Sequence, residues 1–299
     1  PWVRRVSEEF GTLHHYIKFD TPGLVQSLIG AMEARDLPGM ADVDSSLFLF
    51  CREIKKDATV SLSGECADEI FGGYPWFHRE DMLNAGTFPW SISIDERVNI
   101  LSKEAYELIR PEEYIERRYR ETLEQMPRLP GESGLDARRR EMFYLNITWF
   151  MANLLDRKDR MSMAHGLEVR VPYCDHRLVQ YVWNIPWELK MLDGREKGLL
   201  RKALTGVLPD DVLYRKKSPF PKTHNPSYEK LVKQRLSDIL HDPNSPLLPL
   251  VDKKVLLEMM SESSDLGKPW FGQLMARPQM YAWLMQADAW LRRYKVRLV

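Results

Sequence analysis

The feature that most constrains the fold is a short apolar stretch, residues 58–62, that runs directly into residues 63–74, SGECADEIFGGY. A short apolar stretch of this kind is typical of a buried strand in a parallel sheet. Ligands of open α/β sheets bind at the carboxyl ends of the strands. The junction after residue 62 is therefore predicted to be a ligand site.

The segment after this junction combines a tight turn with carboxylates. Ser63 and Gly64 predict a turn where the backbone can approach a ligand closely. Glu65, Asp68 and Glu69 follow, and Glu65 and Asp68 share a face if a helix starts there. Near a phosphate, such carboxylates usually hold Mg²⁺ or a cationic group.

A plainer interpretation of the same residues is a capped helix start, with Ser63 as N-cap and the acids in the first turn. Gly72 and Gly73 favour more than this, because each would weaken a helix by roughly 1 kcal/mol. We expect the two glycines to end the helix for a reason outside the helix.

The neighbouring residues indicate an α/β fold. We predict a strand over residues 15–19, a helix over 21–35 with Thr21 as N-cap, a second helix over 45–56 and the strand over 58–62. This order is half of a βαβ arrangement. A unit of roughly 45 residues cannot close a core alone. We therefore expect the partner strands to come from residues before Pro1.

The rest of the chain reads as helical almost everywhere from Glu96 onward, with the longest stretch over residues 137–165. The tail from Met280 carries a stripe of tryptophan and leucine side chains, which we interpret as core or interface. The predicted organisation is a partial α/β nucleotide-binding core over residues 1–95 and a helical remainder over residues 96–299.

Composition excludes several classes of function. Lys+Arg and Asp+Glu are both 43, so no global basic field attracts a nucleic-acid backbone or a membrane, and no apolar run reaches the roughly 20 residues of a membrane span. Cys51, Cys66 and Cys174 are odd in number and widely spaced, which suggests neither a disulfide nor a zinc site and fits the cytoplasm. The chain lacks an initiator Met, and we expect its start to be a cut end.

Residues 63–74 resemble the second nucleotide-site signature of the asparagine synthetase family, usually written S-G-[DE]-G-x-D-E-x-F-G-G-Y, with Cys66 in place of the common glycine. Three further stretches resemble motifs of the same family in the same order: residues 159–175 (DRMSMAHGLEVRVPYCD), 194–201 (GREKGLLR) and 208–217 (LPDDVLYRKK). The resemblance covers roughly residues 10–221.

The resemblance implies a parallel sheet of the adenine nucleotide alpha hydrolase-like (ATP-pyrophosphatase) kind, with ATP and Mg²⁺ as cofactors. It implies ATP-dependent conversion of aspartate to asparagine. The aspartate side chain attacks the α-phosphorus, pyrophosphate leaves, and a β-aspartyl-adenylate forms. Ammonia delivered from glutamine then displaces AMP.

The resemblance also implies roles for individual residues. Ser63 and Gly64 would contact the nucleotide through the backbone, and Asp68 would bind Mg²⁺ through pyrophosphate. Glu65 would act as a base toward ammonia. Lys197 would bind the phosphates and stabilise charge as it develops on them.

Lys197 also stands out on physical grounds, because it lies near the start of a helix predicted over residues 196–203, where the helix dipole disfavours a cation. A phosphate would neutralise it, and the alternative is an exposed surface lysine. Asp159 and Arg160 are assigned by the resemblance to the substrate pocket. The alternative for them is a structural ion-pair network, which we favour for Glu168 and Arg170.

Two parts of the family pattern have no counterpart in this chain: the phosphate-gripping S-G-G-x-D-S loop and the N-terminal glutaminase domain with its leading cysteine. We expect that the chain begins inside the synthetase domain and does not complete the reaction alone. The expected partners are aspartate, ATP, and ammonia from glutamine through that glutaminase domain. A homodimer is compatible with the resemblance.

Two other functions remain open at this point. The first is a related synthetase or amidotransferase that adenylates another carboxylate. The second is a truncated domain that binds without catalysis, against which the intact signature and Lys197 argue.

Overall fold

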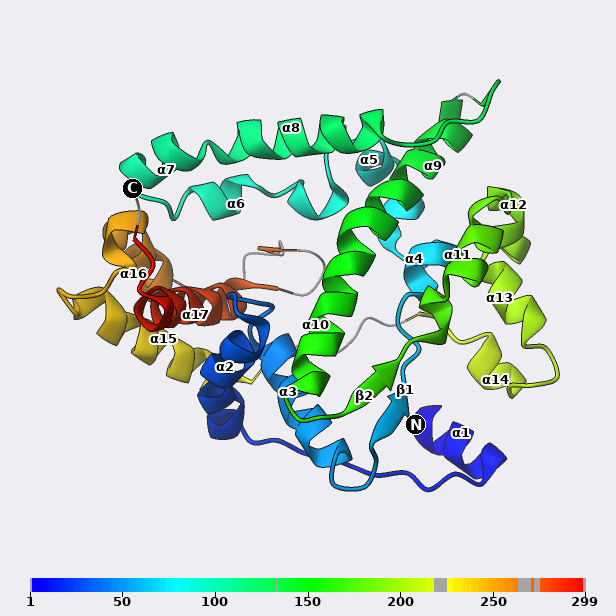
Figure 1. Ribbon diagram of the computed structural model, residues 1–299, viewed down its shortest axis with the longest axis horizontal. Helices are drawn as coiled ribbons and strands as arrows, with labels where there is room; N and C mark the ends of the chain where they lie inside the picture. Colours follow the sequence, from blue (N-terminus) through cyan, green and yellow to red (C-terminus); the bar gives the residue numbers. More distant parts are fainter. Residues whose placement is uncertain (1, 133, 218–224, 263–269, 272–274, 298–299) are drawn as a thin grey trace.

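The computed structural model describes residues 2–132, 134–217, 225–262, 270–271 and 275–297. These residues are mostly helical and include a two-stranded parallel sheet (Figure 1). In the first half of the chain the elements are α1 (Trp2–Phe10), α2 (Thr21–Arg35), α3 (Asp42–Ile54), β1 (Val60–Leu62), α4 (Ala67–Phe71), η1 (Pro75–Phe77), α5 (Glu80–Leu83), η2 (Pro89–Ser91), α6 (Asp95–Val98), α7 (Lys103–Ile109), α8 (Pro111–Glu124) and α9 (Gly134–Leu145).

The second half continues the helical pattern and adds the second strand. Its elements are the π-helix η3 (Asn146–Met151), α10 (Ala152–Met163), β2 (Glu168–Arg170), η4 (Pro172–Cys174), α11 (His176–Trp183), α12 (Trp187–Lys190), η5 (Leu192–Gly194), α13 (Gly198–Ala203), α14 (Asp210–Leu213), α15 (Pro226–His241), η6 (Leu248–Leu250), α16 (Lys253–Ser261) and α17 (Arg277–Tyr294). The stretch predicted over residues 137–165 is therefore α9, η3 and α10 in succession.

The first predicted helix is confirmed, with one correction at its start. α2 begins at Thr21, but its N-cap is Asp20, whose Oδ1 accepts a hydrogen bond from the Gly23 N–H at 2.8 Å. Asp20 is the cap because its carboxylate accepts a hydrogen bond from an N–H of the first turn that has no partner within the helix.

The strand predicted over residues 15–19 is wrong, since these residues form no regular structure. Alternation of polar and apolar side chains stabilises a strand only where a neighbouring strand accepts its hydrogen bonds, and no described residue pairs with this segment.

The strand after α3 is confirmed as parallel, whereas the partner strands expected before Pro1 stay a prediction. β1 pairs with β2, with Val60 opposite Glu168 and Leu62 opposite Arg170. The partner strand thus comes from later in this chain, in a region that the sequence pattern predicted to be helical. The prediction of a buried strand is also wrong for the described structure, because Leu62 is 75% exposed.

The largest core joins both ends of the chain. Val25 and Leu28 of α2 pack with Tyr228 and Val232 of α15 and with Leu284 of α17. The apolar stripe of the tail is therefore core, as predicted. Since this core draws on residues before and after position 95, the division of the chain at that position stays a prediction.

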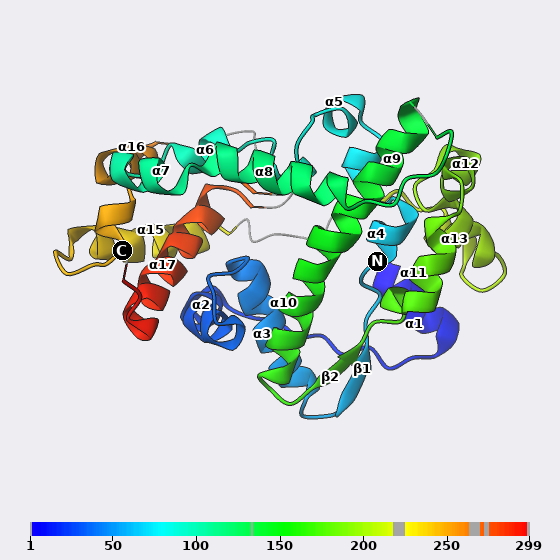
Figure 2. The same ribbon diagram turned by 45° about the horizontal axis from the view of Figure 1, so that its top comes forward.

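The long α10 runs between two groups of helices (Figures 1 and 2). On one side lie α2, α15 and α17, and on the other side lie α4, α11 and α13. Apolar residues of α4, η3 and α11, among them Ile70, Met151 and Val182, form a second core on the latter side. α10 can therefore bring side chains from one group into contact with the other.

Cys66 and Cys174 form a disulfide across 108 residues of sequence, and Cys51 is a buried free thiol. The expectation of no disulfide is wrong, because the parallel pairing of β1 and β2 brings the segments that follow both strands together. The cysteine argument for a reducing compartment is removed with it. Among the described residues, no helix has both the length and the apolar character that crossing a membrane requires.

Candidate functional site

The signature segment begins where β1 ends, as the sequence predicts. The Ser63 N–H donates to the Arg170 carbonyl at 2.9 Å, which extends the parallel ladder by one bond. The helix starts only at Ala67, so Ser63 is not its N-cap. Gly64 is exposed, with no atom within 4 Å of an added Cβ, so its backbone is open to a ligand.

The N-cap of α4 is Cys66, which has φ of 74° in the left-handed region. Glycine adopts this conformation without steric cost, whereas other residues pay for it. The backbone at this position therefore suits the glycine of the usual signature. In this chain the disulfide to Cys174 holds a side chain there.

Asp68 is the centre of a charged cluster drawn from three parts of the chain. Its Oδ1 lies 2.9 Å from Lys197 Nζ and 3.1 Å from Lys217 Nζ. Burial disfavours the charged carboxylate, but the two lysines outweigh it and hold the pKa of Asp68 below its ordinary value. Two ammonium groups on one carboxylate leave one net positive charge, which suits a polyanion.

The position of Lys217 is set by more than Asp68. Its Nζ donates to the Gly73 carbonyl and lies 4.5 Å from the centre of the Tyr74 ring. Burial lowers the pKa of Lys217, and Asp68 opposes that shift. Lys217 lies in the RKK stretch at residues 215–217, to which the sequence assigned no role.

Gly72 has the expected reason outside the helix, whereas Gly73 leaves room for a side chain of α4 itself. A Cβ on Gly73 would lie 1.8 Å from Asp68 Oδ1, and one on Gly72 would lie 2.6 Å from the Trp187 ring. Gly72 also has φ of 71° and ends α4 as its C-cap. Gly73 thus leaves room for the carboxylate that the lysines contact.

Glu69, the residue next to Asp68 on α4, is fully buried. Its Oε1 accepts a hydrogen bond from the Tyr74 hydroxyl at 2.5 Å, and burial raises the pKa of Glu69. Burial and the neighbouring Glu69 also raise the pKa of Tyr74. This pair holds the end of the signature segment against α4.

Glu65 lies on the loop between β1 and α4 and reaches α10. Its Oε1 accepts a hydrogen bond from Arg157 Nη2 at 3.3 Å and lies 3.4 Å from Lys158 Nζ. Its Oε2 is buried and has no hydrogen-bond partner among the described residues. One carboxylate oxygen of Glu65 is therefore fixed by two cationic side chains, whereas the other has no hydrogen-bond partner among the described residues.

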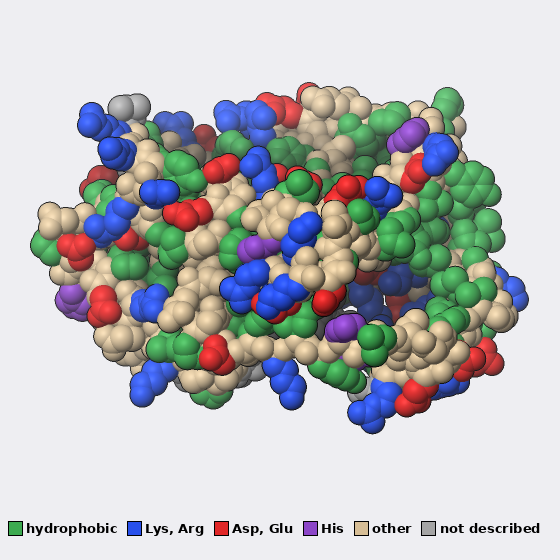
Figure 3. All heavy atoms as spheres, turned by 60° about the horizontal axis from the view of Figure 1, so that its bottom comes forward, with side chains coloured by type: hydrophobic (Ala, Val, Ile, Leu, Met, Phe, Trp, Pro, Cys, Tyr) green, Lys and Arg blue, Asp and Glu red, His purple; other side chains and the backbone are tan. Residues whose placement is uncertain are grey.

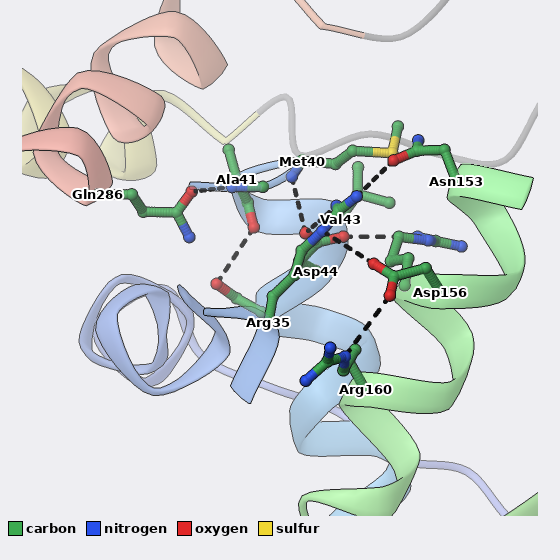
Figure 4. Close-up of polar contacts among 12 residues, drawn as sticks. Arg35, Met40, Ala41, Val43, Asp44, Asn153, Asp156, Arg160 and Gln286 are labelled. Atoms are coloured by element: carbon green, nitrogen blue, oxygen red, sulfur yellow. Dashed lines mark hydrogen bonds and ion pairs between the residues drawn. The ribbon is translucent and has the colours of Figure 1, made fainter. Parts of the chain in front are cut away.

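The two residues of α10 that were assigned to a substrate pocket are not part of the contacts around Asp68 and Glu65 described above. Asp159 and Arg160 are exposed, and Arg160 pairs with Asp36 at 3.2 Å and Asp156 at 3.5 Å. Figure 4 shows Arg160 pointing toward Asp156. Their substrate role stays a prediction, whereas the neighbouring Arg157 is the residue that reaches the signature segment.

Lys197 occupies the N-cap of α13 with φ of 57° and turns its side chain to Asp68. The structure thus gathers Lys197 and Asp68 and keeps Glu65 close to Arg157 and Lys158. The sequence analysis missed Arg157, Lys158 and Lys217. Charge type alone gave no signal for them, because lysine and arginine also cover much of the surface.

A hollow with basic and acidic side chains inside it opens on the face shown in Figure 3, in the half of the molecule that holds α4. The described residues contain no group of three or more side chains placed to hold a metal ion by themselves. Mg²⁺ is usually held by one or two carboxylates together with substrate phosphates. Asp68 beside two lysines fits that mode.

Helices around a short parallel sheet, with a carboxylate and two lysines beyond one strand's carboxyl end, are consistent with an α/β protein that carries a candidate anion site. A family model described as asparagine synthase matches residues 1–292. The chain belongs to the asparagine synthase family. The match extends past residue 221, where the motif resemblance ended.

Three curated relatives show the range of similarity. The chain is 56% identical over 297 residues to glutamine-hydrolyzing asparagine synthetase 3 of Bacillus subtilis, and the aligned region covers 99% of this chain and 48% of that protein. It is 34% identical over 207 residues to asparagine synthetase 1 of the same organism, covering 58% and 32%. It is 28% identical over 226 residues to the enzyme of Rattus norvegicus, covering 73% and 31%. The chain spans about half the length, or less, of these relatives.

Proposed function

We propose that the protein is an asparagine-forming ligase that adenylates aspartate with ATP and transfers ammonia from glutamine to the adenylate. The observation that carries the proposal is Asp68 between Lys197 and Lys217, beyond the carboxyl end of β1, in a chain of the asparagine synthase family. The names of the relatives, glutamine-hydrolyzing asparagine synthetases, support aspartate and glutamine as substrates.

The lysine pair would bind the phosphates of ATP. Displacement at the α-phosphorus releases pyrophosphate, and fixed positive charge stabilises the negative charge that develops on the leaving oxygens. Lys197 and Lys217 both contact the same oxygen of Asp68 and are both about one-quarter exposed, so they are accessible to a ligand yet held in place. The backbone of Ser63 and Gly64, which is open at Gly64, would contact the nucleotide.

Asp68 would hold Mg²⁺ that arrives with the phosphates, and the bound ion would neutralise further negative charge there. Glu65 would accept a proton from ammonia as it attacks the adenylate, through the oxygen that has no hydrogen-bond partner among the described residues. Asp159 and Arg160 remain proposed substrate contacts. A nucleotide-binding sheet of the adenine nucleotide alpha hydrolase-like kind, a cytoplasmic location and a homodimer are also proposals.

Pyrophosphate release from ATP by the full-length protein tests the proposal, with aspartate present or absent and ammonia in excess. We expect release that depends on aspartate, with asparagine as product. Release that ignores aspartate but responds to another carboxylic acid would keep the adenylation and change the substrate. No release with any acid would overturn the proposal and favour a binding role.

Two variants test the residue assignments in the same assay. Glu65→Gln should form pyrophosphate but little asparagine, and Lys197→Ala should lose both products, because the first residue acts on ammonia and the second on the phosphates. Both should keep the far-ultraviolet circular dichroism of the parent. Full activity of either variant would remove the role assigned to that residue.

A further inference from the structure

Arg157 joins two carboxylates that come from different parts of the chain. Its Nη2 lies 3.3 Å from Glu65 Oε1, and its Nη1 lies 3.8 Å from Asp44 Oδ1. Glu65 is on the loop after β1, and Asp44 is in the first turn of α3. The side chain of Arg157 is 11% exposed and that of Asp44 is 1% exposed. The guanidinium is therefore enclosed between two acids rather than free in solvent.

Asp44 is itself held from several directions. Its Oδ2 accepts hydrogen bonds from the Met40 N–H at 2.7 Å and from Arg35 Nη1 at 3.3 Å. Arg35 in turn donates to Asn153 Oδ1 and lies 3.6 Å from Asp156 Oδ2, so it is fixed against α10 (Figure 4). Asp44 thus gives Arg157 an anchor on the side away from the signature segment.

Glu65 has little support from its own segment. It precedes α4, whose first residue is Ala67, so no helix of its own orients it. Among the described residues, Glu65 forms ion pairs with Arg157 and Lys158, which are both on α10 and both contact Oε1. The direction of this side chain is therefore decided by α10 and not by the loop that carries it.

We propose that Arg157, braced by Asp44, is a positioning residue that fixes the Glu65 carboxylate and leaves Oε2 available to the reacting group. This inference rests on the proposed role of Glu65 toward ammonia. Arginine suits the position because one nitrogen of its planar fork donates to Glu65 while the other lies in ion-pair range of Asp44. A lysine there keeps the charge but loses the two separate nitrogens with which the guanidinium faces the two acids.

A purely structural ion-pair network makes a different prediction. Loss of such a network lowers the amount of folded enzyme, and so lowers pyrophosphate release and asparagine formation to the same extent. A positioning role lowers the step that uses Glu65 and spares the step that does not. It also makes the effect of changing Arg157 depend on whether Glu65 is present.

The experiment is a double-mutant cycle in the full-length protein with Arg157→Lys and Glu65→Gln, with aspartate, ATP and ammonia. Aspartate-dependent pyrophosphate release and asparagine formation are measured side by side within a single turnover, because in steady state the adenylate must be consumed before pyrophosphate is released again. We expect Arg157→Lys to slow asparagine formation at least about 10-fold, to change the KM for ATP less than about 2-fold, and to have no further effect in the Glu65→Gln background. Equal losses in both reactions, or multiplying losses in the double variant, would overturn the proposal.

A second variant keeps the test open if Arg157→Lys does not fold. Lys158→Met removes the other contact of Glu65 and should slow asparagine formation several-fold, again only when Glu65 is present; multiplying losses here overturn the proposal too. The matched control is Arg120→Met on α8, which breaks an exposed pair with Glu116 and should leave both reactions unchanged. Absence of any aspartate-dependent pyrophosphate release in the parent would instead overturn the proposed function.

Discussion

Single residues give the candidate site its charge. Burial opposes ionisation of Asp68, yet Lys197 and Lys217 lower its pKa, so the carboxylate stays charged across the neutral range. A lowered pKa means that its contribution to stability is present above the ordinary pKa of an aspartate and is lost as the pH falls through the lowered value. The same lysines leave the cluster with a net positive charge, which would attract a phosphate.

Lys217→Ala should weaken ATP binding while leaving the protein folded. Hydrogen bonds to charged groups contribute roughly 1.5–3 kcal/mol, so we expect the KM for ATP to rise by about one to two orders of magnitude. Steady-state kinetics of pyrophosphate release measures this. Lys202→Ala, an exposed lysine in the last turn of α13, is the control. Equal KM values in Lys217→Ala and the parent would exclude Lys217 from the phosphate site.

Lys190 provides a separate prediction about stability and pH. This side chain is 2% exposed, its Nζ lies 3.9 Å from the centre of the Phe143 ring, and burial together with Arg140 lowers its pKa from 10.5 to about 7. Between pH 7 and 10 the unfolded chain binds a proton that the folded chain has released, so the free energy of unfolding should rise with pH.

Lys190→Met should remove that rise and make the protein more stable at pH 7, by on the order of a few kcal/mol. Urea unfolding at several pH values between 7 and 10 measures both effects. A pH dependence that is the same in the variant and the parent would show that Lys190 is charged in the folded state.

At the level of elements, the junction of α9 and α10 decides where α10 points. The π-helix η3 separates them, and π-helical turns shift the following helix relative to the preceding one. Asn146 at its start is fully buried, accepts from Trp76 Nε1 at 3.1 Å and donates to the Met142 carbonyl at 2.8 Å. This residue fixes η3 against the core that carries the signature segment.

Asn146→Leu should therefore destabilise the protein by about 1–3 kcal/mol, because it leaves the Trp76 indole N–H buried without a partner. Thr148→Ala in the same element is the control, since its exposed hydroxyl donates only to the Tyr144 carbonyl and should contribute little. Denaturant unfolding compares the two. A smaller loss for Asn146→Leu than for Thr148→Ala would contradict this account of η3.

On the scale of the whole molecule, a disulfide and a shared core tie distant parts of the chain together. Cys66 and Cys174 close 108 residues of sequence, and α17 packs on α2 from the opposite end of the chain. Gln286 of α17 donates to the Leu28 carbonyl at 2.9 Å and accepts from the Gly39 N–H at 3.1 Å. The segment before Asp44 is therefore held by the last helix.

Reduction of the Cys66–Cys174 disulfide should lower the free energy of unfolding by about 2–4 kcal/mol, because it releases a long loop in the unfolded state. Denaturant midpoints with and without reductant measure the change. Cys174→Ala should unfold at the same midpoint in both conditions, whereas Cys51→Ala should keep the response to reductant. A parent midpoint that ignores reductant would contradict the prediction.

The sequence by itself determined what depends on neighbouring residues. The α2 helix, the strand at β1, the ligand segment that follows it and the end of α4 at Gly72 all follow from local patterns, and the family follows from ordered motifs. Local preferences act over a few residues, so they are visible in a linear sequence.

Only the tertiary structure decided the partners of those segments. The pairing of β1 with β2, the disulfide, and the contacts of Asp68 with Lys217 and of Glu65 with Arg157 join residues about 90 to 150 positions apart. No local pattern encodes such contacts, because they arise from how helices such as α10 pack once the cores have formed. The charges of the site were readable from the sequence, and their geometry came from packing.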